Sequence, residues 1–135
     1  MKKRTVFDTN IWISYIINAR FYELASMQTE NDVLFLRSMP AVIELKDVLS
    51  RKKFEKYHFN IKEIIDLYTD ITEFCNTNAL FKDCVDPDDN FLFDLAIQGN
   101  ANYLVSGDKQ VRNTPVKSDA LKIITLTEFK EEINS

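Results

Sequence analysis

Acidic side chains stand at four points of the sequence where a predicted strand ends or a predicted helix begins. Asp8 and Asp108 each follow a short apolar run typical of a buried strand, and Glu44 and the cluster 86–89 lie near the starts of predicted helices. Carboxylates gathered in one crevice repel each other and raise one another's pKa values, and a divalent cation removes that cost. Mg²⁺ and Mn²⁺ prefer oxygen ligands. If the four points meet, the pattern predicts a divalent-metal site.

Each of these acids also has a simpler explanation. Asp8 could cap the helix that follows it, and Asp108 could be an ordinary turn residue. Asp86 could cap the next helix, and Asp88 and Asp89 would then complement the positive end of that helix. Three carboxylates in four residues are nevertheless more than capping requires.

Helical geometry separates Glu44 from an ordinary surface acid. At about 100° per residue, Glu44 points to the inward side of its helix, together with Ala41 and Val48. An unpaired buried charge is very costly, so this carboxylate needs a partner. The partner is either a cation of the predicted site or the basic side chain of a structural salt bridge.

The same geometry selects one acid of the cluster. When Asn90, Asp94 and Gln98 form the polar face of the helix, Asp89 falls on the inward side. Asp88 is only slightly less inward, so the preference for Asp89 is small.

Strands and helices alternate along the chain. The predicted strands are residues 5–7, 33–36, 103–105 and 123–124, with 79–85 a short strand or extended segment. The predicted helices are 10–17, capped by Thr9 or Asn10, and 21–28, 40–49, 61–74, 86–98 and 127–133. This alternation predicts one α/β domain over residues 1–135, a three-layer sandwich around a parallel sheet of four to five strands.

Composition narrows the class of protein further. The net charge of −4 means that nucleic-acid binding would need local basic patches. No apolar run approaches the roughly 20 residues of a membrane-spanning helix. His58 is the only histidine, and Cys75 and Cys84 lack the spacing of a zinc site. Unpaired cysteines fit a reducing compartment, so we expect a cytoplasmic protein without a membrane segment.

Four motifs together resemble the PIN-domain (PilT N-terminal) nuclease family, which includes the toxins of VapBC-type toxin–antitoxin pairs. The sequence Val-Phe-Asp-Thr-Asn ends the first strand, and Tyr-Leu-Val-Ser-Gly-Asp ends a later one. The segments that carry the resemblance are residues 6–10, 43–49, 86–96 and 103–108, with 124–129 similar to a subgroup of PIN toxins.

The resemblance implies a site and a reaction. The four acids of the family fall on Asp8, Glu44, Asp89 and Asp108, which would hold one or two Mg²⁺ or Mn²⁺ ions and hydrolyse phosphodiester bonds in RNA. The supporting positions are Thr9 or Asn10 after the first acid, Ser106 before the last acid, and Asp86 or Asp88 beside the third. The alternative is a non-catalytic module of the same fold that binds RNA or protein.

The resemblance also implies partners: an RNA substrate, a cognate antitoxin protein and a second copy in a homodimer. The side chains that could guide phosphates are Arg51, Lys52, Lys53, Lys56, Lys109 and Arg112, each of which could equally belong to a solvated face. The apolar residues that could form an interface are Trp12, Tyr15, Ile16, Phe21 and Tyr22, with the core as the alternative.

Overall fold

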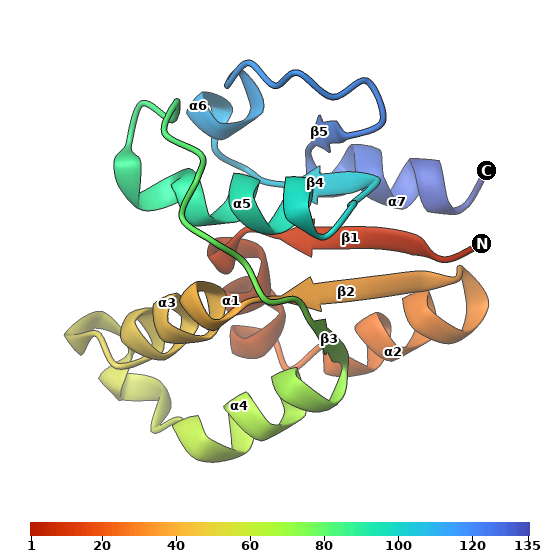
Figure 1. Cartoon of the computed structure of the whole chain (residues 1–135). Coiled ribbons are helices and arrows are strands. Elements are labelled where there is room, and N and C mark those ends of the chain that lie inside the picture. Colours follow the sequence, from red (N-terminus) through yellow and green to blue (C-terminus); the bar gives the residue numbers. More distant parts are fainter.

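The computed structural model describes all residues, 1–135, and shows a five-stranded parallel sheet between layers of helices (Figure 1). The strand order is β3-β2-β1-β4-β5. The strands are β1 (Lys3–Phe7), β2 (Val33–Arg37), β3 (Thr72–Phe74), β4 (Tyr103–Val105) and β5 (Lys122–Ile124). The predicted α/β class and parallel sheet are confirmed.

Seven α-helices connect and cover the strands. They are α1 (Thr9–Ile17), α2 (Phe21–Glu30), α3 (Met39–Leu49), α4 (Ile61–Asp70), α5 (Asn90–Gln98), α6 (Lys109–Arg112) and α7 (Leu126–Ile133). Two 3₁₀ helices, Lys52–Tyr57 and Pro87–Asp89, precede α4 and α5. Helix α3 begins as its sequence predicts, with Ser38 capping it through its hydroxyl. The helix predicted for residues 86–98 begins with Pro87 in a 3₁₀ turn, and α5 itself starts only at Asn90.

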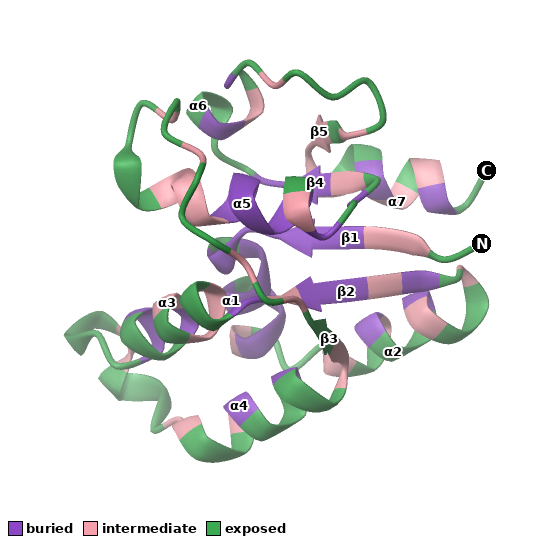
Figure 2. Cartoon of the chain, in the orientation of Figure 1, coloured by how far each residue is buried: buried purple, intermediate pink, exposed green.

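The sheet separates two cores because neighbouring side chains of a strand point to opposite faces. Phe7 belongs to the larger core, with side chains of α1, α2, α3, α4 and α7, whereas Val6 belongs to the smaller core beneath α5. Purple, buried segments accordingly run through β1, β2 and the inner side of α5 (Figure 2). None of the helices combines the length and hydrophobicity that crossing a lipid bilayer requires.

The strand order places a topological switch point between β1 and β4. From β1 the chain proceeds to β2 and β3 on one side, and it then returns to β4 and β5 on the other side. In open α/β sheets, ligands bind in the crevice outside the carboxyl ends of the strands at such a point. The residues that follow β1 and β4, which include Asp8 and Asp108, therefore lie at the expected place for a site.

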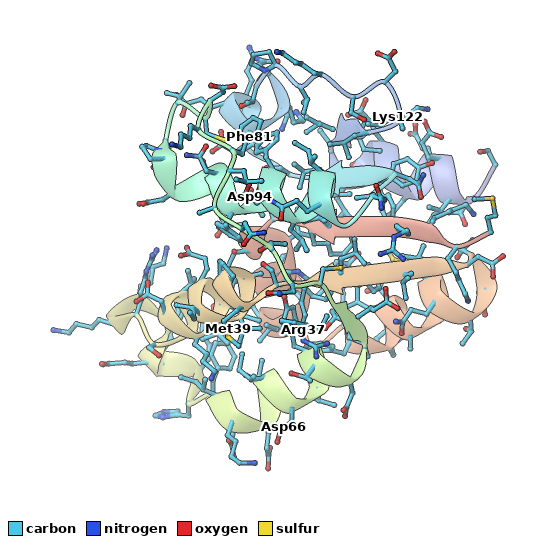
Figure 3. The ribbon with its side chains drawn as sticks, in the orientation of Figure 1. Arg37, Met39, Asp66, Phe81, Asp94 and Lys122 are labelled. Carbon is cyan, nitrogen blue, oxygen red and sulfur yellow. The ribbon has the colours of Figure 1, made fainter.

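The predicted helix 61–74 is too long. Helix α4 ends at Asp70, and Thr72–Phe74 forms β3, which pairs with β2. Arg37 of β2 stabilises the break, because its Nη1 donates to the carbonyl oxygens of Thr69 (3.1 Å) and Thr72 (2.5 Å). Its guanidinium lies at this corner (Figure 3). The helical periodicity continues past Asp70, but strand pairing and this cation determine the structure.

Of the two alternatives for the first helix, an interface or the core, the structure supports the core for three residues. Trp12, Tyr15 and Ile16 are buried within the single chain, in the larger core. Phe21 packs against the same core, and Tyr22 alone is largely exposed, at 69%.

Candidate active site

The switch point carries a chain of hydrogen bonds from one strand end to the next. The Asp8 amide donates to the Val105 carbonyl (2.9 Å), so β1 and β4 remain paired up to the site. The Ser106 hydroxyl donates to Asp8 Oδ2 (2.6 Å) and accepts from the Asp108 amide (3.0 Å). Ser106 and Asp8 are both buried. Ser106 thus fixes the Asp8 carboxylate relative to the loop that carries Asp108.

Capping does not explain Asp8. It occupies the N-cap position of α1, where Thr9 or Asn10 was expected, but its side chain makes no capping hydrogen bond. Burial raises the pKa of Asp8, and the charge of Asp108 raises it further, whereas the Ser106 hydroxyl and the amides of Asn10 and Thr9 lower it. A buried carboxylate with these neighbours suits the binding of a cation.

Asp108 combines a structural contact with an electrostatic one. Its Oδ1 accepts from the Gln110 amide (2.9 Å) and caps α6, so this oxygen has an ordinary structural role in the turn. Its Oδ2 accepts no hydrogen bond from the protein. The charge of Asp108 raises the pKa values of both Asp8 and Asp89, so its negative charge acts on both carboxylates.

Asp89 is the acid of the cluster that faces the others. It is half-buried at the start of α5, whereas Asp86 and Asp88 are exposed. Asp86 caps the 3₁₀ helix through the Asp88 amide (2.9 Å), as capping predicts. Burial raises the pKa of Asp89 to about 6, with further contributions from the charges of Asp8, Asp86, Asp108 and Asp88.

Glu44 lies on α3, and the charge of Asp8 contributes to its raised pKa. It is half-buried and forms no ion pair, so the salt-bridge alternative is wrong. Arg51 is the cation that lowers this pKa, but its Nη2 pairs with Asp47 (3.3 Å). Burial raises the pKa of Glu44; Arg51 lowers it, and the charges of Asp47, Asp88 and Asp8 raise it. Asp8 therefore interacts electrostatically with each of the other three acids.

The chemistry of these residues fits a hard divalent cation. Every candidate ligand is a carboxylate oxygen, one carboxylate is buried, and each acid destabilises the charge of at least one other. No three of the His, Cys, Asp and Glu side chains lie close enough to one point to bind one ion together. In the first turn of α1, Thr9 is buried and Asn10 is exposed.

Two of the six predicted cationic side chains lie close to the acids. Arg112 Nη1 donates to the Ser106 carbonyl (3.0 Å), and Arg51 lies near enough to lower the pKa of Glu44. Lys53 and Lys56 instead lie over the rings of Phe54 and Tyr57, and Lys52 and Lys109 are exposed.

The polar face of α5 was misread from the sequence. Asn90, Asp94 and Gln98 do not face solvent but bind residues 75–85, which we call the connecting segment. Asp94 is only 7% exposed. The segment 79–85, expected as a strand or extended chain, forms no strand and has no regular secondary structure. The sequence signal for this contact was the spacing of the three polar residues, which stand at every fourth position.

Replacing Ser106 by Ala is expected to weaken Mn²⁺ binding and cleavage about 10- to 100-fold, as for other residues that orient a ligand. The substitution removes the hydroxyl that donates to buried Asp8 Oδ2. Mn²⁺ titration by calorimetry measures the affinity directly. Ser26→Ala, the same change at an exposed position of α2, is the matched control. Equal affinities of Ser106→Ala and wild type would show that this hydrogen bond does not orient Asp8.

Replacing Asp89 by Asn is expected to stabilise the metal-free protein above pH 6. Between about pH 4 and 6 the folded protein retains a proton on Asp89 that the unfolded chain has released, so stability falls as the pH rises through this interval. The Asn side chain carries no charge, so the variant does not lose this stability. We place the gain in the free energy of unfolding at about 1 kcal/mol, because Asp89 is partly solvated. Urea unfolding at pH 7.5 with EDTA measures the difference, and a less stable variant would contradict the repulsion described above.

Comparison with known proteins agrees with this geometry. The family model described as PIN domain matches residues 4–110. An uncharacterized protein of Methanocaldococcus jannaschii, MJ1680, is 26% identical over an alignment of 144 positions. The alignment covers 98% of this chain and 92% of that protein.

Two solved structures share the fold. A chain of VapBC2 from Rickettsia felis, crystallised with a DNA fragment from its promoter, has a TM-score of 0.62 and 17% identity, covering 90% of this chain and 98% of that one. PAE2754 from Pyrobaculum aerophilum has a TM-score of 0.57 and 10% identity, covering 97% and 89%. With the family model matching most of its length, the chain belongs to the PIN domain family.

Proposed function

We propose that this protein is a divalent-metal-dependent endoribonuclease and the toxin component of a type II toxin–antitoxin pair. The observation that carries the proposal is the junction of β1 and β4, where the Ser106 hydroxyl bonds both the Asp8 carboxylate and the Asp108 amide. The raised pKa values of Asp8, Glu44 and Asp89 support it, because the charge of at least one other acid contributes to each of them. A fold gains no stability from carboxylates that repel each other at the switch point of its sheet. Their presence is explained by a ligand that needs them.

The acids divide into two roles. Asp8 and Asp89 are the proposed primary ligands of Mg²⁺ or Mn²⁺, because Asp8 is the buried acid and its charge raises the pKa of Asp89. Glu44 and Asp108 would hold a second ion or ordered water. When bound, such a cation supplies a more acidic water and stabilises negative charge on the phosphoryl oxygens.

The remaining polar groups orient the reacting partners. Ser106 holds the Asp8 carboxylate in place through its hydroxyl. Arg112, anchored to the Ser106 carbonyl, and Arg51, near Glu44, provide positive charge on two sides of the acids. We propose that these two guanidinium groups bind RNA phosphates next to the scissile bond, because a guanidinium matches the geometry of phosphate.

The proposed biological role rests on the structural relatives. The fold resembles that of a chain in the VapBC2 complex, whose structure contains a promoter DNA fragment. By analogy, an antitoxin protein would bind this chain and block the acidic crevice, and the complex would include a homodimer. The competing function is a non-catalytic module of the same fold, which would bind RNA or protein without cleaving RNA.

The direct test is incubation of the purified protein with a mixed-sequence RNA in the presence of Mn²⁺, Mg²⁺ or EDTA. We expect cleavage products with either metal and none with EDTA. RNA binding without cleavage in any divalent metal would reject the nuclease and support the binding module.

A further inference from the structure

The connecting segment and helix α5 line a cavity of about 380 Å³ that is open to solvent. Its walls include Pro40 from the first turn of α3 and Pro87 from the turn that carries Asp89. Asn90, the residue after Asp89, also lines it. Both helices that supply acids therefore supply walls of the cavity as well. In Figure 1 the connecting segment, in green, leaves β3, passes the start of α3 and crosses α5.

Three side chains of α5 hold the connecting segment in place. Asn90 Oδ1 accepts from the Cys84 amide (3.1 Å), and Gln98 exchanges two hydrogen bonds of 2.8 Å with the backbone of Asn78. Between them lies Asp94, on the side of α5 that the segment crosses (Figure 3). The wall of the cavity is thus fixed by side chains one helical turn apart, although the segment contains no regular secondary structure.

Asp94 has one oxygen that the fold uses and one that it does not. Its Oδ1 accepts from the amides of Leu80 (3.1 Å) and Phe81 (2.8 Å) and from Gln98 Nε2 (3.2 Å). Its Oδ2 accepts no hydrogen bond from the protein, and Asp94 lines the cavity. Oδ2 is not sealed from solvent, so it can accept a hydrogen bond from a donor group of a ligand in the cavity.

The other walls suit a flat, partly apolar ligand. Phe81 is stacked on Phe93 with 4.6 Å between ring centroids, which makes one wall rigid, and Phe91 adds a second aromatic ring. Lys82 is the only cation among the lining residues. Pockets that read single-stranded RNA combine such apolar surfaces with hydrogen-bonding groups for the edges of an unstacked base.

We propose that this cavity is a subsite for one base of the RNA, next to the scissile phosphate, and that it selects bases with an exocyclic amino group through Asp94 Oδ2. Cytosine, adenine and guanine offer such a donor, whereas uracil presents a carbonyl oxygen at the corresponding place. The inference rests on the proposed function, because it assigns part of an RNA substrate to the neighbourhood of the acids.

The test compares cytidine and uridine, which are neutral nucleosides of nearly the same shape. Because they carry no phosphate, the acids do not repel them and no cleavage intervenes. Titration of the isotope-labelled protein, followed by NMR, is expected to show about 10-fold tighter binding of cytidine, with shifts at Asn78, Phe81 and Asn90. Equal affinities, or shifts elsewhere on the protein, would overturn the proposal.

The variant Asp94→Asn sharpens the comparison. The three donors to Oδ1 keep the amide oxygen in that place, so the amide nitrogen takes the position of Oδ2 and presents a donor instead of an acceptor. The preference is expected to invert in favour of uridine, whereas Asp66→Asn, an exposed carboxylate of α4, leaves it unchanged. An Asp94→Asn protein that is folded and still prefers cytidine would reject the role of Asp94.

A second variant covers the case in which Asp94→Asn does not fold. Phe91→Ala is expected to weaken the binding of cytidine and uridine equally, because it removes an apolar wall of the cavity and no contact to a base edge. Unchanged binding by Phe91→Ala would overturn the subsite. The outcomes also separate the two proposals: nucleoside selection without metal-dependent cleavage would reject the nuclease alone, and cleavage without base selection would reject the subsite alone.

Discussion

Asp8→Asn is expected to reduce metal-dependent RNA cleavage by about 10³-fold while the protein stays folded. The amide keeps the shape of the carboxylate and can still accept from Ser106, whose hydroxyl lies 2.6 Å from Asp8 Oδ2. The amide cannot supply the negative charge that holds a cation at the switch point, and removing one strong electrostatic contact to a transition state typically costs about 10²–10³-fold. Initial rates on a fluorescent RNA at saturating Mn²⁺ measure the loss.

Asp66→Asn is the matched control for this variant. Asp66 is an exposed carboxylate on α4, far from the strand ends, and pairs with Lys62 on the same helix (Figure 3). An exposed pair of this kind stabilises the fold by at most about 0.5 kcal/mol, so cleavage should change less than about twofold. Full activity of a folded Asp8→Asn protein would show that the acids do not carry the reaction.

Phe7→Ala is expected to destabilise the fold by about 3–5 kcal/mol. Phe7 is 3% exposed and lies within 4.9–6.2 Å, between ring centroids, of Phe35, Trp12, Phe129 and Tyr15. Truncation removes the ring at the centre of this aromatic cluster, and the stiff rings around it cannot fill the space. The decrease would consume a large part of the roughly 5–15 kcal/mol that stabilises a typical domain.

Urea unfolding monitored by Trp12 fluorescence measures this loss as a shift of the midpoint. Tyr22→Ala, at a largely exposed aromatic side chain of α2, is expected to change the free energy of unfolding by less than about 0.5 kcal/mol. Because Asp8 follows Phe7 directly, cleavage by Phe7→Ala should fall with the folded fraction. A midpoint like that of wild type would show that the cluster is not the centre of the core.

The parts of the fold that local chemistry determines were predictable from the sequence. Short apolar runs ending in polar residues located β1, β2 and β4, and Ser38 and Pro87 marked helix starts. The side of α3 that Glu44 faces also followed from helical geometry, whereas the choice of Asp89 assumed a solvent-facing polar face on α5 that the structure does not have. The role of Ser106 required the resemblance to a family, since nothing nearby in the sequence indicates its hydrogen bond to Asp8 across 98 residues.

The remaining features depend on contacts between distant segments. Thr72–Phe74 continues a helical pattern, and only pairing with β2 makes it a strand. Asp94 looks like a solvated residue because the backbone amides that it binds belong to a segment without a hydrophobic pattern. Trp12 and Tyr15 could lie in an interface or in the core by sequence, and Phe7 and Phe35 on neighbouring strands place them in the core.

Anomalous diffraction from a crystal soaked in Mn²⁺ is the decisive test of the proposal that Asp8 and Asp89 bind a divalent cation with Glu44 and Asp108 around it. We expect an anomalous peak in contact with the carboxylates of Asp8 and Asp89, with Glu44 or Asp108 beside it, and no such peak for Asp8→Asn. A fully soaked wild-type crystal with no peak between these side chains, or with Mn²⁺ only at other carboxylates, would contradict it.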